Sequence, residues 1–432
     1  MTAPRQPSDW SWSSGMAYGL LGLPLAFAAL PLYVVLPNHY ARSFGLSLAT
    51  VGALLMVVRL VDAVVEPWLG RASDALFARS ARAVLLAGGW AAGLQWLGMS
   101  GLFFPPVHSD GALAVWLVGG LLLTCMAHSL LVIAHQAWGV RLGGDDLLRG
   151  RIVAWREGLG LLGVIAASAL SVVWGPPAML AALGLTLLLG WLVWWRAPRP
   201  APLPVSQAAP MPLWQPLAQP AFRRLLLVFM CNGIASAIPA ALMLFFAQDR
   251  LRASEEATAM FLVLYFICGA ASMPLWLRAV RALGLARSWL LGMLLAVVCF
   301  GWTAGLGSGQ VLAFATICAL TGVALGADLA LPGALLARLI AQQGAQGQHD
   351  GAYLGWWSLA TKLNLALAAG AALPLLQWLG YAPGSQDEQA LQHLAWAYAL
   401  VPCVLKLLAA CLLYVLLIRR EPSPALTQRN LP

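Results

Sequence analysis

Twelve long apolar segments recur along the chain, and they restrict its fold more than any other feature. They lie at about 15–37, 47–70, 83–104, 112–139, 152–174, 178–196, 223–247, 256–277, 288–306, 311–338, 353–379 and 392–418. A helix needs about 20 apolar residues to cross a bilayer. Only 9% of the residues are charged, whereas about 25% are charged in a soluble domain. The sequence therefore predicts an all-α polytopic membrane protein with twelve transmembrane helices.

Arginine residues are distributed unevenly over the loops between these segments. Loops that follow even-numbered segments contain fourteen of them, and loops that follow odd-numbered segments contain only Arg42, Arg250 and Arg252. Positive residues accumulate in short cytoplasmic loops. We therefore expect a multi-pass protein of the cytoplasmic (inner) membrane with both termini in the cytoplasm. The net charge of +9 follows from this topology and does not indicate a nucleic-acid partner.

The longest stretch between apolar segments lies at mid-chain and is rich in proline. Proline stiffens a linker and prevents the preceding helix from continuing. The expected organisation is a cytoplasmic tail, a six-helix bundle, a cytoplasmic Pro-rich linker, a second six-helix bundle and a cytoplasmic tail. Their ranges are 1–14, 15–195, 196–222, 223–418 and 419–432.

The second apolar segment contains three ionisable residues, in the stretch MVVRLVDAVVEPWLG at 56–70. Arg59, Asp62 and Glu66 fall on one narrow face of a helix, with the two acids one turn apart. Each charge near the bilayer centre costs about 2.5–3.5 kcal/mol, so this face must line the bundle interior or a water-filled cavity. A similar Pro-containing segment around 274 repeats the pattern but has Gly269 and Met273 in place of the acids. The asymmetry indicates a functional role for Asp62 and Glu66, which we expect to bind a cation.

Three more ionisable residues lie inside apolar segments. Lys362 is close to the middle of 353–379, and we expect it to act in the cation site or as the coupling partner of the acids. Asp328 either lines the substrate cavity or hydrogen-bonds backbone at a kink before Pro332. The role of Lys406 stays open.

Further cavity candidates are His135, Arg156 and Trp357. His135 shares a helix face with His128 and is either a hydrogen-bonded interior side chain or part of the pocket. Trp357 belongs either to the cavity or to an interfacial aromatic belt. Motifs for metal binding, nucleotide binding or hydrolysis are missing from the sequence. We therefore expect no enzyme activity, no cofactor and no metal site, and a monomer with a small-molecule substrate in a lipid bilayer.

Several stretches resemble the melibiose-permease-like family of glycoside–pentoside–hexuronide:cation symporters. They include R-xx-D-xxx-E-P-xx-G at 59–70, HQAWGVRLGGDDLLRGRIVAWREGLG and GWWSLATKLNLALAAG. The resemblance implies the major facilitator fold, with two six-helix halves around a midplane site. It implies cation binding by Asp62 and Glu66, with Lys362 near that site. It also implies places in the substrate cavity for Arg59, Trp138 and Arg156.

The stretch GRASDALFARSAR resembles the loop between the second and third spans of major facilitator proteins. In that family an Asp and Arg residues of this loop pair with helix ends and latch the cytoplasmic face. The resemblance therefore implies that Gly70, Asp74 and Arg79 form a gating loop.

The chain also departs from the sugar permeases of this family. Ala26 and Ala134 stand where the family has sugar-binding Asp residues, and Val65 and Leu131 replace an Asn and a Thr of the sodium site. With few neutral oxygen ligands, two facing carboxylates favour a shared proton over Na⁺. The sequence therefore predicts H⁺-coupled symport of a small organic solute by alternating access. The alternatives are Na⁺ coupling, a proton-driven exporter or antiporter of amphiphilic compounds, a lysolipid transporter, and a channel or sensor.

Overall fold

The computed structural model describes residues 10–173, 175–201, 211–378, 380–382 and 384–420. The regular secondary structure of these residues is helical, with no strand. The outer parts of both predicted tails, 1–9 and 421–432, and the middle of the predicted linker, 202–210, lie outside them. Twelve helical stretches of the described chain coincide with the twelve apolar segments. The all-α polytopic fold expected from the sequence is thus confirmed.

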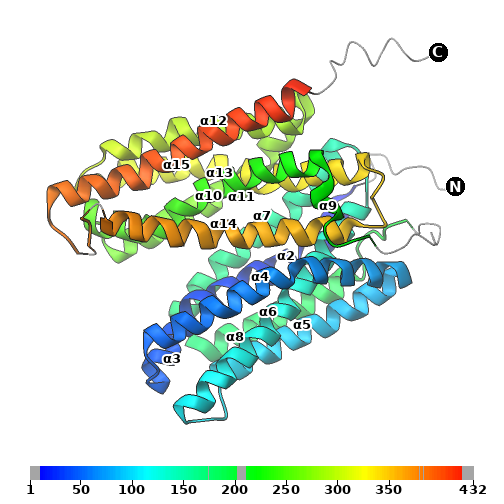
Figure 1. The fold of residues 1–432 in the computed structure, drawn as a ribbon, viewed down its shortest axis with the longest axis horizontal. Coiled ribbons are helices and arrows are strands. Elements are labelled where there is room, and N and C mark those ends of the chain that lie inside the picture. Colours follow the sequence, from blue (N-terminus) through cyan, green and yellow to red (C-terminus); the bar gives the residue numbers. More distant parts are fainter. Residues whose placement is uncertain (1–9, 174, 202–210, 379, 383, 421–432) are drawn as a thin grey trace. The chain divides into compact units, whose positions relative to one another are not determined.

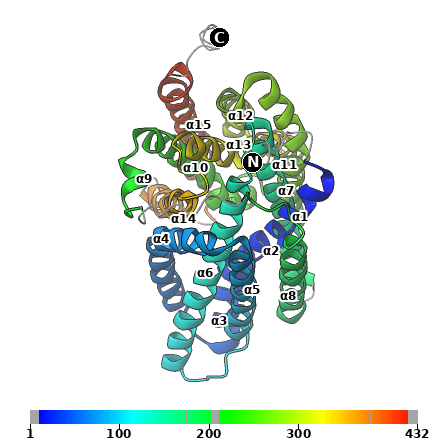
Figure 2. The ribbon, with the colours of Figure 1, turned by 90° about the vertical axis from the view of Figure 1, so that its right-hand side faces the viewer.

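The chain forms two compact units, of which unit 1 contains residues 1–216 and 337–359. The helices that begin within it are α1 (Trp12–Gly19), α2 (Gly22–Phe27), α3 (Leu36–Phe44), α4 (Leu48–Arg79), α5 (Ala81–Phe103), α6 (Asp110–Arg141), α7 (Asp146–Val173), α8 (Gly175–Trp194), α9 (Gln215–Ala218) and α14 (Asp350–Trp378). Helices α4, α5 and α6 run side by side (Figure 1). Helix α2 packs against α7 and α8 (Figure 2).

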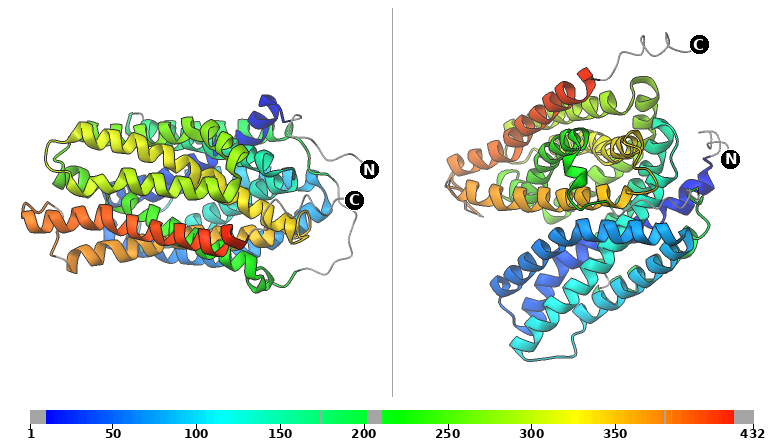
Figure 3. Two further views of the ribbon diagram at one scale, coloured as in Figure 1. Left: turned by 90° about the horizontal axis from the view of Figure 1, so that it is seen from above. Right: turned by 45° about the vertical axis from the view of Figure 1, so that its right-hand side comes forward.

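Unit 2 contains residues 217–336 and 360–432. Its helices are α10 (Pro220–Phe245), α11 (Glu255–Leu283), α12 (Leu285–Phe300), α13 (Val311–Gln342) up to residue 336, the later part of α14 and α15 (Glu388–Leu416). Helix α15 packs along α10 and also contacts α12 (Figure 3). The sequence-based boundaries of the two six-helix halves stay a prediction.

Side-chain caps begin several of these helices. Ser47 accepts a hydrogen bond from the Thr50 amide at the start of α4, at 3.1 Å, and Ser80 accepts one from Ala83 at the start of α5, at 3.0 Å. Asp387 does the same for α15. Such caps satisfy amides that have no partner within the helix, so short polar loops are sufficient to separate the long apolar helices.

The first span is broken into pieces. A turn separates α1 from α2, and a π-helical stretch, η2 (Pro31–Val35), precedes α3. Pro24 and Pro31 lack the amide donor that a regular helix needs at those positions. The π-helical turn after α10, η3 (Phe246–Arg250), and the 3₁₀ turns η4 (Gly301–Gly305) and η5 (Ile418–Arg420) extend three other helices.

Helix α4 is longer than its apolar segment. The sequence analysis places a loop directly after residue 70, but the helix continues to Arg79. The stretch RASDALFAR contains no Gly or Pro and is made mostly of residues with good helix propensity. Asp74 is therefore held on a helix and not on a flexible loop.

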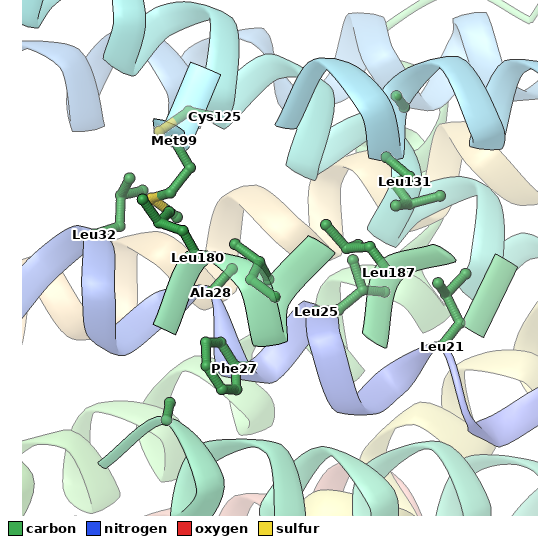
Figure 4. Packing of buried hydrophobic residues seen from close by; sticks show 14 of the residues in the cluster. Leu21, Leu25, Phe27, Ala28, Leu32, Met99, Cys125, Leu131, Leu180 and Leu187 are labelled. Atoms are coloured by element: carbon green, nitrogen blue, oxygen red, sulfur yellow. The ribbon is translucent and has the colours of Figure 1, made fainter. Parts of the chain in front are cut away.

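Each unit has its own apolar core. In unit 1, Leu21 and Leu25 lie beside Leu187 of α8 (Figure 4). In unit 2, buried side chains of α10, α11, α13 and α15 meet around Phe246, Phe314 and Tyr398. These cores hold the helices that carry the polar groups described below.

Nine helical stretches of the described residues are long and apolar enough to cross a membrane. They are Trp12–Phe44, Asp110–Arg141, Asp146–Leu170, Gly175–Trp194, Pro220–Arg250, Glu255–Leu283, Leu285–Gly305, Val311–Gln342 and Glu388–Arg420. The remaining long helices, α4, α5 and α14, contain 32, 23 and 29 residues. All three are longer than the roughly 20 residues that a crossing requires.

Candidate functional site

Helix α4 buries its acids and exposes its apolar side chains, which is the reverse of a helix in water. Asp62 is 2% exposed and Glu66 is 0% exposed, while Met56, Val57 and Val64 on the other side are largely exposed. Lipid satisfies exposed apolar side chains, and acids in a membrane protein face the protein interior. The arrangement agrees with the one-face geometry that the sequence predicts for Asp62 and Glu66.

The Asp62 carboxylate is in contact with α6. Ser129 donates a hydrogen bond from Oγ to Asp62 Oδ1 at 3.1 Å, and both residues are buried. Arg59 lies above the ring of Tyr33, with its guanidinium carbon 3.7 Å from the ring centroid. A cation above an aromatic face is attracted by the ring quadrupole. Asp62 and Arg59 are thus each held by a neighbouring span of unit 1.

Glu66 lies where α4 and the first part of α14 touch. A Cβ atom added to Gly355 would be only 2.6 Å from the Glu66 carbonyl oxygen and 2.8 Å from Cα of Pro67. The two backbones therefore approach closely at Gly355, as helices do in membranes when small residues lie between them.

His135 is buried on α6 and joins this helix to the first span. Its Nε2 is 2.8 Å from the carbonyl oxygen of Tyr18, and the Tyr18 hydroxyl donates to the His135 carbonyl at 3.1 Å. The imidazole ring also packs on the Tyr18 ring and on Trp194. The structure thus places His135 in an interior position where Nε2 is hydrogen-bonded and the buried Nδ1 has no partner among the described residues. A role of His135 in the cavity stays a prediction.

Trp138 and Arg156 both lie in unit 1, in different surroundings. Trp138 is fully buried, packs against Trp194 and donates from Nε1 to the Pro198 carbonyl at 2.9 Å. Arg156 on α7 pairs with the neighbouring Glu157, and its backbone carbonyl lies close against Gly22. Cavity roles for Trp138 and Arg156 stay predictions.

Asp74 caps the start of α14. Its two carboxylate oxygens accept hydrogen bonds from the amides of Gly351 and Ala352, at 2.8 and 2.9 Å. Arg141, at the end of α6, donates to Asp74 at 3.0 Å and contacts Asp350 at 2.9 Å. A carboxylate at a helix N-terminus is favoured by the free amides and the helix dipole. We call Asp74, Arg141 and Asp350 the charged latch.

Burial dominates the titration of the charged latch. It raises the pKa of Asp74 to about 6 and that of Asp350 to about 7, although the Arg141 guanidinium beside both carboxyls opposes the change. Both acids lie outside the predicted membrane spans. The latch thus holds two acids around one base, and it binds a proton more readily than free carboxyls do.

The other predicted gating residues lie near the charged latch. Gly70 is in backbone contact with Gly351, since a Cβ on either would be 2.1 Å from the carbonyl oxygen of the other. Arg79 is exposed at the last turn of α4.

Trp357, a cavity candidate, is buried on α14, and its neighbour Trp356 donates from Nε1 to the Leu213 carbonyl at 2.8 Å.

A second buried ion pair lies in unit 2. Lys406 of α15 contacts Asp328 Oδ2 of α13 at 2.7 Å and donates to Ser236 of α10 at 2.9 Å. Trp289 of α12 donates from Nε1 to Asp328 Oδ1 at 3.0 Å, and Asn232 of α10 donates to the same oxygen at 3.1 Å. The sequence analysis left Asp328 and Lys406 open, and the structure brings them together. We call these five residues the Asp328 cluster.

Asp62, Glu66 and Arg59 share α4 in unit 1, whereas Lys362 belongs to the part of α14 in unit 2. The relation of Lys362 to the acids stays a prediction. Among the described residues, no group of three or more His, Cys, Asp or Glu side chains is arranged to hold a metal ion.

The sequence analysis missed Ser129, Arg141 and the pairing of Lys406. Arg141 was interpreted only as a marker of topology, and Ser129 is an ordinary small residue in an apolar helix. Lys406 did give a signal, because lysine is rare in this chain and costly in a span. Its partner is 78 residues away along the sequence, so spacing does not reveal the pair.

Comparison with known proteins identifies the fold family. A family model described as MFS/sugar transport protein matches residues 14–420. A search of curated proteins found no significant match. Among solved structures, a bacterial homologue of the iron transporter ferroportin in its outward-facing state is similar, with a TM-score of 0.70 and 17% identity. The similarity covers 93% of this chain and 98% of that one.

Two sugar:proton symporters are also similar in structure. For the fucose:proton symporter of E. coli the TM-score is 0.65 at 14% identity, over 92% of this chain and 99% of that one. For a proton:xylose symporter of the major facilitator superfamily it is 0.64 at 13% identity, over 96% of each chain. At these identities the similarity concerns the fold alone.

Proposed function

We propose a coupling mechanism for this chain, which belongs to the MFS/sugar transport protein family of the major facilitator superfamily and is therefore a secondary transporter. The mechanism is symport of a small organic solute with a cation, by alternating access. The cation is H⁺ and it binds at Asp62 and Glu66. The observation that carries the proposal is the burial of both acids on a helix that exposes apolar side chains on its other side.

Charge neutralisation explains why such acids suit a coupled carrier. An ionised carboxylate inside a membrane protein costs several kcal/mol unless a partner compensates it (about 2.5–3.5 kcal/mol on insertion scales). A proton on Glu66 or Asp62 removes that charge and permits the loaded carrier to reorient, whereas the unloaded carrier with ionised acids resists reorientation. Transport of the solute is then tied to movement of the proton.

Residues around the acids favour H⁺ over Na⁺. Sodium prefers several oxygen ligands, and the nearby Val65 and Leu131 have none in their side chains. Two carboxylates one helical turn apart need only a proton between them to lower their repulsion. Ser129, which donates to Asp62, stabilises the carboxylate that remains ionised.

The finer assignments are part of the same proposal. We place the chain in the melibiose-permease-like glycoside–pentoside–hexuronide:cation symporter group, as a monomer in the cytoplasmic (inner) membrane with both termini in the cytoplasm. Lys362 and Arg59 serve as coupling partners. Because Ala26 and Ala134 replace the sugar-binding acids of that group, the solute is held by other residues.

Transport in proteoliposomes tests the coupling site. The full chain is reconstituted and offered radiolabelled sugars and polyols, including D-xylose and L-fucose, under an imposed pH gradient, a Na⁺ gradient or no gradient. We expect accumulation only with the inward H⁺ gradient. Asp62→Asn and Glu66→Gln should abolish accumulation and leave solute exchange without a gradient intact, because the neutral variants mimic the protonated carrier. Asp110→Asn, at an exposed position at the start of α6, serves as the matched control.

Each alternative gives a different result in this assay. Na⁺-driven accumulation would replace H⁺ as the coupling ion, and solute efflux driven by an inward H⁺ gradient would indicate an exporter. Gradient-driven uptake that persists in both acid variants would refute the assignment of the cation site.

A further inference from the structure

The amide of Asn232 has a defined orientation in the Asp328 cluster. A carboxylate has only acceptors, so the amide group that contacts Asp328 must be the NH₂ and not the carbonyl. The Nδ2 atom of Asn232 therefore donates to Asp328 Oδ1, at 3.1 Å. This assignment follows from the chemistry of the partner and not from a choice between two similar atoms. The carbonyl oxygen of Asn232 must point away from Asp328.

That oxygen is buried without a partner. Asn232 is 3% exposed, and its Oδ1 has no hydrogen-bond partner among the described residues. A buried acceptor left without a donor costs about 1–3 kcal/mol. Native proteins rarely tolerate such a group unless water or a ligand satisfies it.

A second orphan carbonyl lies on the neighbouring helix. Asn364 of α14 is 4% exposed, and its Oδ1 is also without a partner in the part of the chain that the structure describes. The Asn364 amide lies directly against Gly233, where an added Cβ would be 2.0 Å from its Nδ2. Gly233 is the residue next to Asn232, so both carboxamides belong to the same region of unit 2.

The charge of the surroundings selects the kind of donor. Asp328 and Lys406 neutralise each other at 2.7 Å, and the Asp328 carboxylate already accepts from Asn232, Trp289 and Lys406. No net negative charge remains to attract a cation. Two amide oxygens beside a balanced ion pair instead suit neutral donors, and hydroxyl groups are the neutral donors that small solutes commonly carry.

We infer that the carbonyl oxygens of Asn232 and Asn364 form a subsite in unit 2 that binds hydroxyl groups of a neutral, polyhydroxylated solute. Asp328, held by Lys406, is the positioning residue that turns the Asn232 carbonyl toward the solute. The inference rests on the proposed function in one respect, since it takes this solute to be the transported one. It also provides a place for hydroxyl recognition in a chain that lacks the two acids at positions 26 and 134.

Equilibrium binding tests the subsite without any gradient. The full chain in detergent micelles is titrated with D-glucose, D-xylose, L-fucose, sorbitol and their deoxy analogues, and binding is measured from the shift in melting temperature. We expect at least one polyol to bind and its deoxy analogues to bind more weakly. Asn232→Ala and Asn364→Ala should each weaken that binding about tenfold, the usual consequence of losing a hydrogen bond to a buried group.

Asn38→Ala is the matched control, because Asn38 is exposed at the start of α3. Should Asn232→Ala fail to fold, Asn364→Ala carries the test, since the carbonyl oxygen that it removes has no hydrogen-bond partner among the described residues. The subsite is overturned if no polyol binds the wild-type chain, or if both alanine variants keep wild-type affinity. The subsite is also overturned if the alanine variants without ligand melt at a higher temperature than the wild type and bind the polyol with the same affinity. The two oxygens would then hold only water.

The two proposals fail separately in these experiments. Asn38→Ala and Asp110→Asn, at exposed positions outside both proposed sites, should keep polyol binding. Loss of binding in Asn232→Ala and Asn364→Ala therefore identifies the subsite, whatever the outcome of the uptake assay on Asp62→Asn and Glu66→Gln. Conversely, a chain that binds polyols through Asn232 and Asn364 but shows no gradient-driven uptake would contradict the coupling mechanism and leave the subsite standing.

Discussion

Arg141 holds two carboxylates that belong to different helices. Its guanidinium contacts Asp74 of α4 at 3.0 Å and Asp350 of α14 at 2.9 Å, and all three side chains are largely buried. One positive charge cannot balance two negative charges, so a buried site of this kind favours a proton on one acid. Burial raises the pKa of Asp350 to about 7, the higher of the two values. Asp350 is therefore the acid that should carry the proton.

We predict that the charged latch makes folding stability pH-dependent. A carboxyl whose pKa in the folded chain lies above its ordinary value of 3.8 binds more protons when folded, so the free energy of unfolding falls as pH rises. The loss should extend from about pH 4 to about pH 7. Asp350→Asn keeps an oxygen that accepts from the Gly347 amide but does not titrate. Its melting temperature should therefore fall less than that of the wild type between pH 5 and pH 8.

Thermal unfolding in detergent at several pH values provides the measurement. Asp110→Asn, at an exposed acid outside the latch, is the control and should follow the wild-type curve. Parallel curves for the wild type and Asp350→Asn would show that the latch does not titrate in this range.

Single residues show which parts of the site a sequence reveals. Asp62 and Glu66 could be identified because an acid inside an apolar helix is costly wherever that helix packs. Ser129, which donates to Asp62 and is 67 residues away from it, gave no such signal. Arg141 and Lys406 acquire their roles only when distant helices meet. The sequence therefore shows which charged side chains are costly to bury, but it does not show which residues of distant helices pair with them.

At the scale of helices, the contact of α4 with the first part of α14 depends on glycine. Gly70 and Gly351 face each other so closely that a Cβ on either would be 2.1 Å from the opposite carbonyl oxygen. Gly355 makes a similar approach to the carbonyl oxygen of Glu66. This contact connects the helix that carries the proposed cation site to the helix that Asp74 caps.

We predict that one methyl group at this crossing destabilises the chain. In Gly351→Ala the new Cβ would clash with the Gly70 backbone, which cannot move aside as a flexible side chain can. The helices must separate, and we expect the free energy of unfolding to fall by about 1–3 kcal/mol, as in other overpacked sites. The midpoint of denaturant-induced unfolding in detergent measures the change.

Gly93→Ala on α5 is a suitable control, because a Cβ there meets nothing within 4 Å. That variant should be as stable as the wild type or slightly more stable, since alanine has the higher helix propensity. Equal stability of the two alanine variants would mean that the crossing is looser than the glycine contacts imply.

Helix positions were predictable from apolar length, but helix ends and interruptions were not. The sequence placed the end of the second span at residue 70, whereas α4 continues to Arg79 because its polar continuation also favours a helix. The first span, predicted as one helix, is divided at a turn and at Pro31. Lipid determines how long an apolar segment must be, while local hydrogen bonding determines where a helix stops.

At the scale of the whole molecule, the chain has the major facilitator fold, and the distribution of arginine predicts its orientation in the membrane. The uneven distribution of arginine predicts that the loop between α4 and α5 is cytoplasmic and that the loop between α5 and α6 is on the outer side. The charged latch belongs to the same end of α4 as the first of these loops. This predicted orientation puts the charged latch on the cytoplasmic side.

Labelling of single cysteines tests the orientation. The seven native cysteines form no disulfide among the described residues. They are first replaced by alanine, and one cysteine is then introduced by Ala78→Cys or Ser109→Cys. Both positions are exposed, one near the end of α4 and the other just before α6. In intact cells, a membrane-impermeant maleimide should label the Ser109→Cys chain, and the Ala78→Cys chain should react only after permeabilisation. The opposite pattern would invert the topology and place the charged latch on the outer side, where it would face the external pH.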